Sequence, residues 1–320
     1  MGYSARYHMA SLAAVFLALA IGILIGSEFG DEIVSDTRDN LESSLTGNLE
    51  DAQDRADDLS RDLELSDAFG ERVYPTLVGD RLADRSIGIL ALGDISGDLA
   101  AEIEGALEPT GGSLIAVGVI REPPDLSELA IDLEDTRFSD LEENLDSVQA
   151  LGTGVGRQLA IGGTLLDVVQ ADLFSRASGT FGDLDGVIVV RDQPSDLEDE
   201  DETATNRLEA GLIDGLQATG ATVVGVETSG VDDSSVPFFQ NSGIANVDDL
   251  DLVAGRVAMV FSLLGARGSF GVKETADRLL PDLLAPVIPR QPGPGSPPPP
   301  RPDQVPPGTP NVGQQQPAGD

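Results

Sequence analysis

An uncharged apolar stretch near the N-terminus constrains this chain more than any other feature. It covers residues 9–27, with the sequence MASLAAVFLALAIGILIGS. A helix rises about 1.5 Å per residue, so a run of this length just crosses a hydrocarbon layer about 30 Å thick. The sequence therefore predicts a transmembrane helix, and it predicts that the rest of the chain lies on one side of a membrane.

The charges beside this run predict its orientation. Arg6 precedes it, whereas the acidic residues Glu28 and Asp31 follow it. Short basic segments stay in the cytoplasm, and acidic segments have little effect on export. We therefore expect residues 1–8 to be cytoplasmic, residues 9–27 to form a signal anchor, and the bulk of the chain to be extracytoplasmic.

A cleavable secretory signal peptide is the alternative to a retained anchor. It would share the basic start and the apolar middle, but it needs a small-residue cleavage site just past the apolar run. The A-x-A-like step in this region, Ala18-Leu19-Ala20, lies inside the run. Both alternatives place the body of the protein in the cell envelope outside the cytoplasm.

Two sequence patterns predict a homo-oligomer. Gly22 and Gly26 form a G-x-x-x-G pair, which lets two membrane helices approach closely. Within residues 28–69, apolar side chains recur in steps of four and three, the a/d seam of a coiled-coil stalk. The seam consists of Leu45, Leu49, Ala52, Ala56, Leu59 and Leu63. Gly70 predicts the end of this helix, and the alternative role of the seam is docking against the chain's own domain.

The body of the chain, residues 84–285, alternates short apolar runs with helical patterns. The predicted strands cover residues 86–92, 113–120, 186–190 and 222–226. The predicted helices cover residues 97–107, 139–150, 156–171, 204–218, 253–264 and 273–284, with an acidic loop at 122–135. Apolar strands separated by helices are typical of an α/β fold, in which helices flank an open, mostly parallel sheet. The runs lack the alternation of membrane β-barrel strands.

The composition changes again at the C-terminal end. Residues 286–320 are rich in proline, glycine and glutamine and contain few apolar side chains. Dense proline prevents regular strands and helices, so this segment is predicted to be a disordered, partly polyproline-II tail.

Charge and residue usage exclude several classes of function. The net charge is −37, from 19 basic and 56 acidic residues, and such a chain repels nucleic acid. Cysteine is absent, which excludes disulfides, thiolate metal sites and thiol nucleophiles. A serine hydrolase would need an exported histidine base, but His8 precedes the membrane run. Paired carboxylates could support glycosidase chemistry, yet they arise by chance in so acidic a chain. We predict no catalytic residue and no cofactor.

Two motifs have alternative interpretations. Gly152, Gly154 and Gly156 approach a dinucleotide-binding loop, but Arg157 occupies the position of the final glycine and a helical pattern precedes the motif. An acidic cluster follows the third predicted strand, where an α/β fold could bind Ca²⁺ or Mg²⁺, although a solvated loop explains the same residues. The cluster comprises Asp192, Asp196, Glu198, Asp199, Glu200, Asp201 and Glu202.

Two segments resemble a known family. They are RYHMASLAAVFLALAIGILIGS at residues 6–27 and NVDDLDLVAGRVAMVFSLLGARGSFGVKETADRLLP at residues 246–281. Together with the heptad segment, they resemble the actinobacterial copper-transporter family typified by the mycobacterial copper transport outer-membrane protein B, MctB. The resemblance covers about residues 5–285 and leaves the proline-rich tail outside it. It implies a membrane-anchored envelope protein of copper efflux or tolerance, with copper ions as a partner.

The resemblance brings no copper-ligand motif to this chain. Cu(I) prefers soft sulfur ligands and Cu(II) prefers imidazole, and the chain has no cysteine, one histidine and three methionines. The metal-site residues therefore remain undefined. The competing hypotheses are a scaffolding envelope protein without a direct copper role and an extracytoplasmic enzyme built on the α/β domain.

Overall fold

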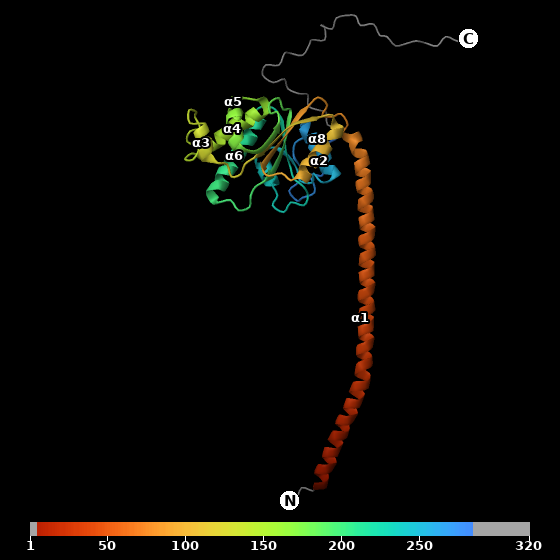
Figure 1. Ribbon diagram of the computed structural model, residues 1–320. Helices are drawn as coiled ribbons and strands as arrows, with labels where there is room; N and C mark the ends of the chain where they lie inside the picture. Colours follow the sequence, from red (N-terminus) through yellow and green to blue (C-terminus); the bar gives the residue numbers. More distant parts are fainter. Residues whose placement is uncertain (1–4, 284–320) are drawn as a thin grey trace, which may run out of the picture. The chain divides into compact units, whose positions relative to one another are not determined.

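The computed structural model describes the backbone of residues 5–283 and the side chains of residues 7–26 and 41–283 (Figure 1). The chain divides into two units, residues 1–69 and residues 70–320. The predicted proline-rich tail, 286–320, and the first four residues of the predicted cytoplasmic segment lie outside the described residues.

Helix α1 runs from Ala5–Val78 and begins in the first unit. Its segment Tyr7–Gly26 is long and apolar enough to cross a membrane, by length and composition, and none of it is buried within the chain. An N-terminal apolar helix is therefore present. Its limits differ by one or two residues from the predicted 9–27.

The predicted end of α1 at Gly70 is wrong, because the helix continues to Val78. Tyr74 and Val78 are buried in the domain core, and this packing outweighs the missing N–H of Pro75 inside the helix. Gly70 has a different role. A Cβ at this position would lie 3.0 Å from a methyl carbon of Val253, so glycine allows the two segments to approach closely.

The second unit contains a seven-stranded sheet with the order β3-β2-β1-β4-β5-β6-β7. All neighbouring strands are parallel except β2 and β3, which are antiparallel. The strands are β1 Ser86–Gly93, β2 Ser113–Ile120, β3 Phe174–Gly179, β4 Gly186–Asp192, β5 Thr222–Val226, β6 Ala245–Val247 and β7 Ser269–Phe270. The prediction of an α/β fold with a mostly parallel sheet is confirmed. The sequence reading missed β3, β6 and β7, because β3 has one buried side chain and the other two are very short.

Helices cover both faces of this sheet (Figure 1). Helices α3 to α6 lie on one side, whereas α2 and α8 lie on the other. The helices are α2 Gly97–Leu107, α3 Leu126–Asp132, α4 Leu145–Ile161, α5 Thr164–Leu173, α6 Asp199–Gln217, α7 Val236–Asn241 and α8 Val253–Leu263, with a 3₁₀ turn at Glu108–Thr110.

Strand β1 shows why its sequence is apolar throughout. Ile87 and Ile89 join the core on the α2 and α8 side, whereas Leu90 and Leu92 join the core on the α3 to α6 side. Since successive side chains of a strand point to opposite faces, a strand that is covered on both faces needs apolar residues at every position.

Several predicted boundaries are corrected by the structure. The predicted helices 139–150 and 156–171 are replaced by α4 and α5, which are separated at Gly162, where φ is +76°. The predicted helix 273–284 is absent from the described part of this range. Instead, the N–H groups of Val272 and Lys273 point to the Asp248 carboxylate, which competes with helical hydrogen bonds. The acidic loop 122–135 contains α3, whose first turn is capped by Asp125.

The glycine motif of residues 152–156 lies inside α4 and serves helix packing. A Cβ at Gly152 would lie 2.4 Å from the Leu208 carbonyl oxygen of α6, and one at Gly156 would lie 2.2 Å from that of Leu212. On α6, Gly211 and Gly215 meet the backbone of α4 in the same way. Two G-x-x-x-G pairs therefore bring the backbones of these helices into contact, which explains the glycines without a nucleotide.

Candidate functional site

The predicted association residues all lie on α1. Apart from the adjacent backbone of α1, no heavy atom of the described residues lies within 4 Å of the position that a Cβ would take at Gly22 or Gly26. The four seam leucines are 57–61% exposed, and both seam alanines are exposed as well. The helical backbone places these residues along one stripe. The single chain therefore leaves its heptad seam uncovered, and self-association through it stays a prediction.

The carboxyl ends of β1 and β4 form the switch point of the sheet, because the chain leaves these two neighbouring strands in opposite directions. Open α/β sheets usually bind ligands at this place. Here the Asp94 N–H donates to the Asp192 carbonyl at 3.1 Å. A Cβ at Gly93 would lie 2.0 Å from the same carbonyl oxygen. The pairing of β1 with β4 therefore continues to the last residues of both strands.

A buried ionic network lies near the carboxyl end of β4. Arg191, near the end of β4, donates from Nε to both carboxylate oxygens of Glu209 at 3.0 Å, and Glu209 is fully buried. Asn206 accepts from the guanidinium at 3.0 Å, and Gln193 donates to Glu209 at 3.0 Å. The guanidinium carbon also lies 4.5 Å from the centre of the Phe238 ring. These partners hold one charge pair in a fixed geometry.

Glu122 lies beside Glu209 in this network, and the pKa of its carboxyl is unusually high. Both of its carboxyl oxygens are buried, and no described donor reaches them while the carboxylate is ionised. Burial, together with the charge and hydrogen bonding of Glu209, raises the pKa of Glu122 to about 9. Burial also raises the pKa of Glu209, although Arg191 opposes this shift. A pKa this high favours the protonated form of Glu122 at pH 7, and a protonated carboxyl can donate to the Glu209 carboxylate.

A second polar cluster lies at the carboxyl ends of β5 and β6. Glu227 accepts from the Lys273 ammonium at 2.6 Å, from the Ser234 hydroxyl at 2.7 Å and from the Ser235 N–H at 2.7 Å. Lys273 is the chain's one lysine, and it also donates to the Val231 carbonyl at 3.0 Å. Glu227 and Lys273 are thus both bonded to groups of the protein itself, which indicates a structural role.

Asp249 is fully buried next to the same cluster. Neither of its carboxyl oxygens has a described hydrogen-bond partner. Burial and the neighbouring carboxylates of Asp248 and Asp251 raise the pKa of Asp249 to about 7. A Cβ at Gly255 would lie 2.6 Å from a carboxyl oxygen of Asp249, so this acid packs against the first turn of α8.

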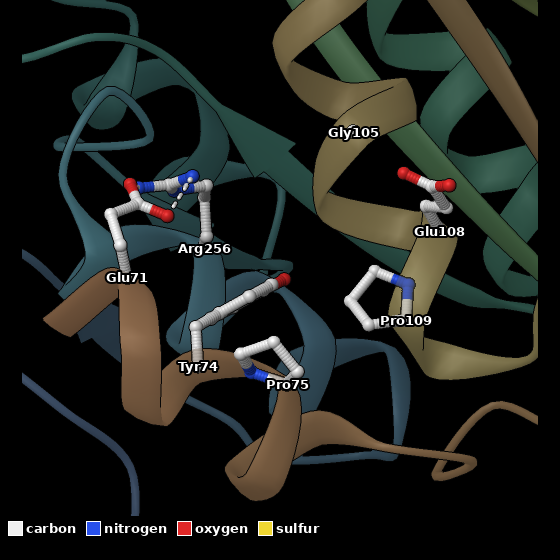
Figure 2. A pocket seen from close by; sticks show the side chains of 7 residues that line it. All are labelled: Glu71, Tyr74, Pro75, Gly105, Glu108, Pro109 and Arg256. Atoms are coloured by element: carbon white, nitrogen blue, oxygen red, sulfur yellow. Dashed lines mark hydrogen bonds and ion pairs between the residues drawn. The ribbon is translucent and has the colours of Figure 1, made fainter.

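A cavity of about 450 Å³ lies between the end of α1, α2 and α8 (Figure 2). Arg256 is ion-paired with Glu71, and its guanidinium carbon lies 5.4 Å from the centre of the Tyr74 ring. The Tyr74 hydroxyl donates to the Ala106 carbonyl at 2.6 Å, and burial raises the pKa of this tyrosine. These contacts hold the last two turns of α1 against α2 and α8.

The acidic cluster of the sequence does not form a metal site in the described residues. Asp192 ends β4, whereas residues 199–202 form the first turn of α6, which begins five residues earlier than predicted. Carboxylates near a helix N-terminus interact favourably with its dipole. In the described part of the chain, no group of three or more acidic or histidine side chains is arranged to hold a metal ion.

Sequence reasoning missed the Glu122, Arg191 and Glu209 network. Arg191 gave one usable signal, because a charged residue directly follows the apolar run of β4. Glu122 lies in a segment that was predicted to be an acidic loop, and Glu209 lies in a helix that contains many other acidic residues. Only the parallel pairing of the strands brings these three residues together.

Similarity to known proteins identifies the family of this chain. The family of copper transport outer membrane proteins, MctB, matches residues 3–281. The chain belongs to this family. The match covers the apolar N-terminal helix and the α/β domain, which confirms the resemblance seen in the sequence.

The copper transporters MctB of Mycobacterium tuberculosis and Mycobacterium bovis are relatives of the chain. Each is 34% identical to it over 114 residues, which make up 35% of this chain and 36% of the relative. The chain thus matches about a third of the length of these curated relatives. The MctB family is described as one of transport proteins rather than enzymes. Both this description and the apolar helix of the present chain fit a location in a membrane.

Proposed function

We propose that this protein is a single-pass envelope protein of copper homeostasis, acting in copper efflux or tolerance. Residues 9–27 anchor it, residues 28–69 form a self-associating coiled-coil stalk, and the α/β domain lies outside the cytoplasm. Membership of the MctB family supports the copper role, and the apolar segment Tyr7–Gly26 supports the anchor.

The uncovered seam on α1 is the observation that supports self-association. Leucines that are about 60% exposed at heptad spacing are unfavourable in water unless another helix covers them. A membrane anchor raises the local concentration of copies, so a parallel bundle forms more readily than it would in free solution.

Direct copper binding is not part of this proposal. Met259 is fully buried in α8, and the described residues provide no cluster of metal ligands. The protein would therefore act on copper through assembly or conduction rather than through a tight soft-ligand site. Titration of the full chain with Cu(I) or Cu(II) should detect no stoichiometric site with submicromolar affinity.

The topology is tested by protease treatment of intact cells. The α/β domain should be cleaved while a cytosolic marker survives. Protection of the domain together with the marker would overturn the topology. Deletion of the gene should then raise cellular copper and copper sensitivity.

Self-association is tested by cysteine crosslinking in native membranes. The chain has no cysteine, so Leu49→Cys introduces a single thiol on the seam. Asp54→Cys, five residues further along the helix and away from the seam, is the matched control. Disulfide-linked dimers should form with Leu49→Cys and much less with Asp54→Cys. Equal crosslinking of the two variants would contradict the seam.

A scaffolding envelope protein without a copper role is the second candidate. It is favoured by the absence of metal-ligand clusters in the described residues and by side chains that are already paired at the carboxyl edge of the sheet. Unchanged copper content after gene deletion, together with altered assembly of other envelope proteins, would support this function instead.

A further inference from the structure

One edge of the sheet is open to an additional strand. Strand β3, Phe174–Gly179, ends the strand order and pairs with β2 alone. From Ser175 to Gly179 its residues are exposed. The opposite edge differs, because two-residue β7 is covered by a turn in which the Asp277 N–H donates to the Ser269 carbonyl at 2.9 Å. Open edges of this length are commonly protected by proline, lysine or a covering segment.

Hydrogen-bonding groups of β3 point outward at known positions. The Thr180 N–H donates to the Ile115 carbonyl at 3.0 Å, which fixes the alternation of the antiparallel ladder. By this alternation, Arg176 and Ser178 exchange hydrogen bonds with β2, whereas the N–H and C=O groups of Ala177 and Gly179 face away from it. No described segment pairs with these outward groups.

A cavity of about 400 Å³ runs beside this edge, between β3 and α5. Asp167, Gln170 and Ala171 line its helix side, and Phe174, Ser175, Arg176 and Ala177 line its strand side. A strand that is added next to β3 would project every second side chain toward α5, into this cavity. The site thus offers backbone pairing and a side-chain pocket together, the combination by which sheet edges recognise extended peptides.

The charge around the groove selects the kind of peptide. Asp167 is the acidic residue of the cavity lining, and α5 carries no basic residue. Arg176, the basic residue of β3, is engaged with the Asp94 carboxylate at 3.1 Å. The acidic α5 beside the edge favours a basic segment over β3 of a second copy, whose α5 carries the same carboxylates. Dense proline in residues 286–320 removes the N–H groups that strand pairing needs.

We infer that the groove between β3 and α5 binds an extended segment of a partner protein by strand addition. A lysine or arginine of that segment enters the cavity and faces Asp167. This inference goes beyond the proposed copper function and does not depend on the membrane topology.

The test uses the full chain in detergent micelles and fluorescently labelled heptapeptides. TVTVKVT is the strand-forming basic probe. TVPVKPT has the same charge but cannot extend the sheet, and TVTVEVT reverses the charge. Anisotropy should show that TVTVKVT binds at least about tenfold more tightly than the other two peptides, a difference of about 1.4 kcal/mol.

Two variants separate the backbone contribution from the charge contribution. Ala177→Pro removes an outward N–H without removing a bond to β2 and should weaken TVTVKVT binding about tenfold, whereas the matched Ala177→Thr should bind like the wild type. Asp167→Lys should reverse the preference, so that TVTVEVT binds more tightly than TVTVKVT. Circular dichroism and thermal melting confirm that each variant is folded.

Three results would overturn the inference. Equal binding of TVTVKVT and TVPVKPT would show attraction by net charge alone. No measurable binding of TVTVKVT would show that the edge accepts no strand of this chemistry. Loss of self-association in Ala177→Pro would assign the edge to a second copy of the chain.

Discussion

Replacement of Glu122 by glutamine should stabilise this protein at neutral and alkaline pH. In the native state, burial and the adjacent Glu209 raise the pKa of Glu122 from its ordinary value of 4.5 to about 9. Between these two pH values the native state holds a proton that the unfolded chain releases. The free energy of unfolding therefore falls as pH rises through this window, and the fall ends above the native pKa.

The size of the effect follows from this difference in bound protons. One proton corresponds to about 1.4 kcal/mol per pH unit. At pH 7.5, which is about three units above the ordinary value, the loss reaches about 4 kcal/mol as an upper limit. Solvent access to the rest of the side chain reduces this figure, so we expect Glu122→Gln to gain roughly 2 kcal/mol at that pH. The glutamine amide can still donate to Glu209.

Urea unfolding of the full chain at pH 5.5, 6.5, 7.5 and 8.5 measures this difference. The chain has no tryptophan, so tyrosine fluorescence reports on unfolding, and Tyr74 is the tyrosine within the α/β unit. The free energy of unfolding of the variant should fall less steeply with pH than that of the wild type. The two slopes should differ by up to about 1.4 kcal/mol per pH unit, which corresponds to one proton. Glu142→Gln, which changes an exposed glutamate, should leave the slope unchanged. Identical slopes for Glu122→Gln and wild type would mean that Glu122 is ionised in the native state, and the reasoning would fail.

Three further substitutions test the rest of the core. Asp249→Asn should remove a loss of stability that extends from pH 3.8 to about 7, because burial and two neighbouring carboxylates raise the pKa of Asp249; urea unfolding at pH 5 and pH 7 checks this. Gly156→Ala should lower the free energy of unfolding by about 3 kcal/mol, because the added Cβ would lie 2.2 Å from the Leu212 carbonyl oxygen. Gly105→Ala, where no other side chain or distant backbone lies within 4 Å of the added Cβ, should raise it by about 0.8 kcal/mol. Thermal melts distinguish the two variants. Lys273→Met should cost about 3 kcal/mol by leaving buried Glu227 without its ion pair, and urea unfolding at pH 7 measures the loss.

Local pattern was sufficient for a large part of the fold. Strand β2 and helix α2 begin and end where the sequence predicted, because each has an unbroken apolar or helical pattern with clear stop signals. Prediction failed where tertiary contacts outweigh local preference. Helix α1 continues through Pro75 because Tyr74 and Val78 are buried in the core.

The glycine motif shows the same limit for the site. Its spacing was visible in the sequence, but Gly152 and Gly156 acquire their role only when α6 lies against α4. In the same way, Glu122, Arg191 and Glu209 are far apart in the chain and belong to segments with different predicted structures. No local rule relates them.

The sequence by itself determined the apolar N-terminal helix, the heptad stripe, the α/β class and the scarcity of soft metal ligands, because each depends on composition or on a periodicity within one segment. Only the tertiary structure decided that glycines bring the backbones of α4 and α6 together, that Glu122 lies buried beside Glu209 and that β3 leaves an open edge. These features arise from the order of strands and from burial, which bring distant residues together and remove water from around their charges.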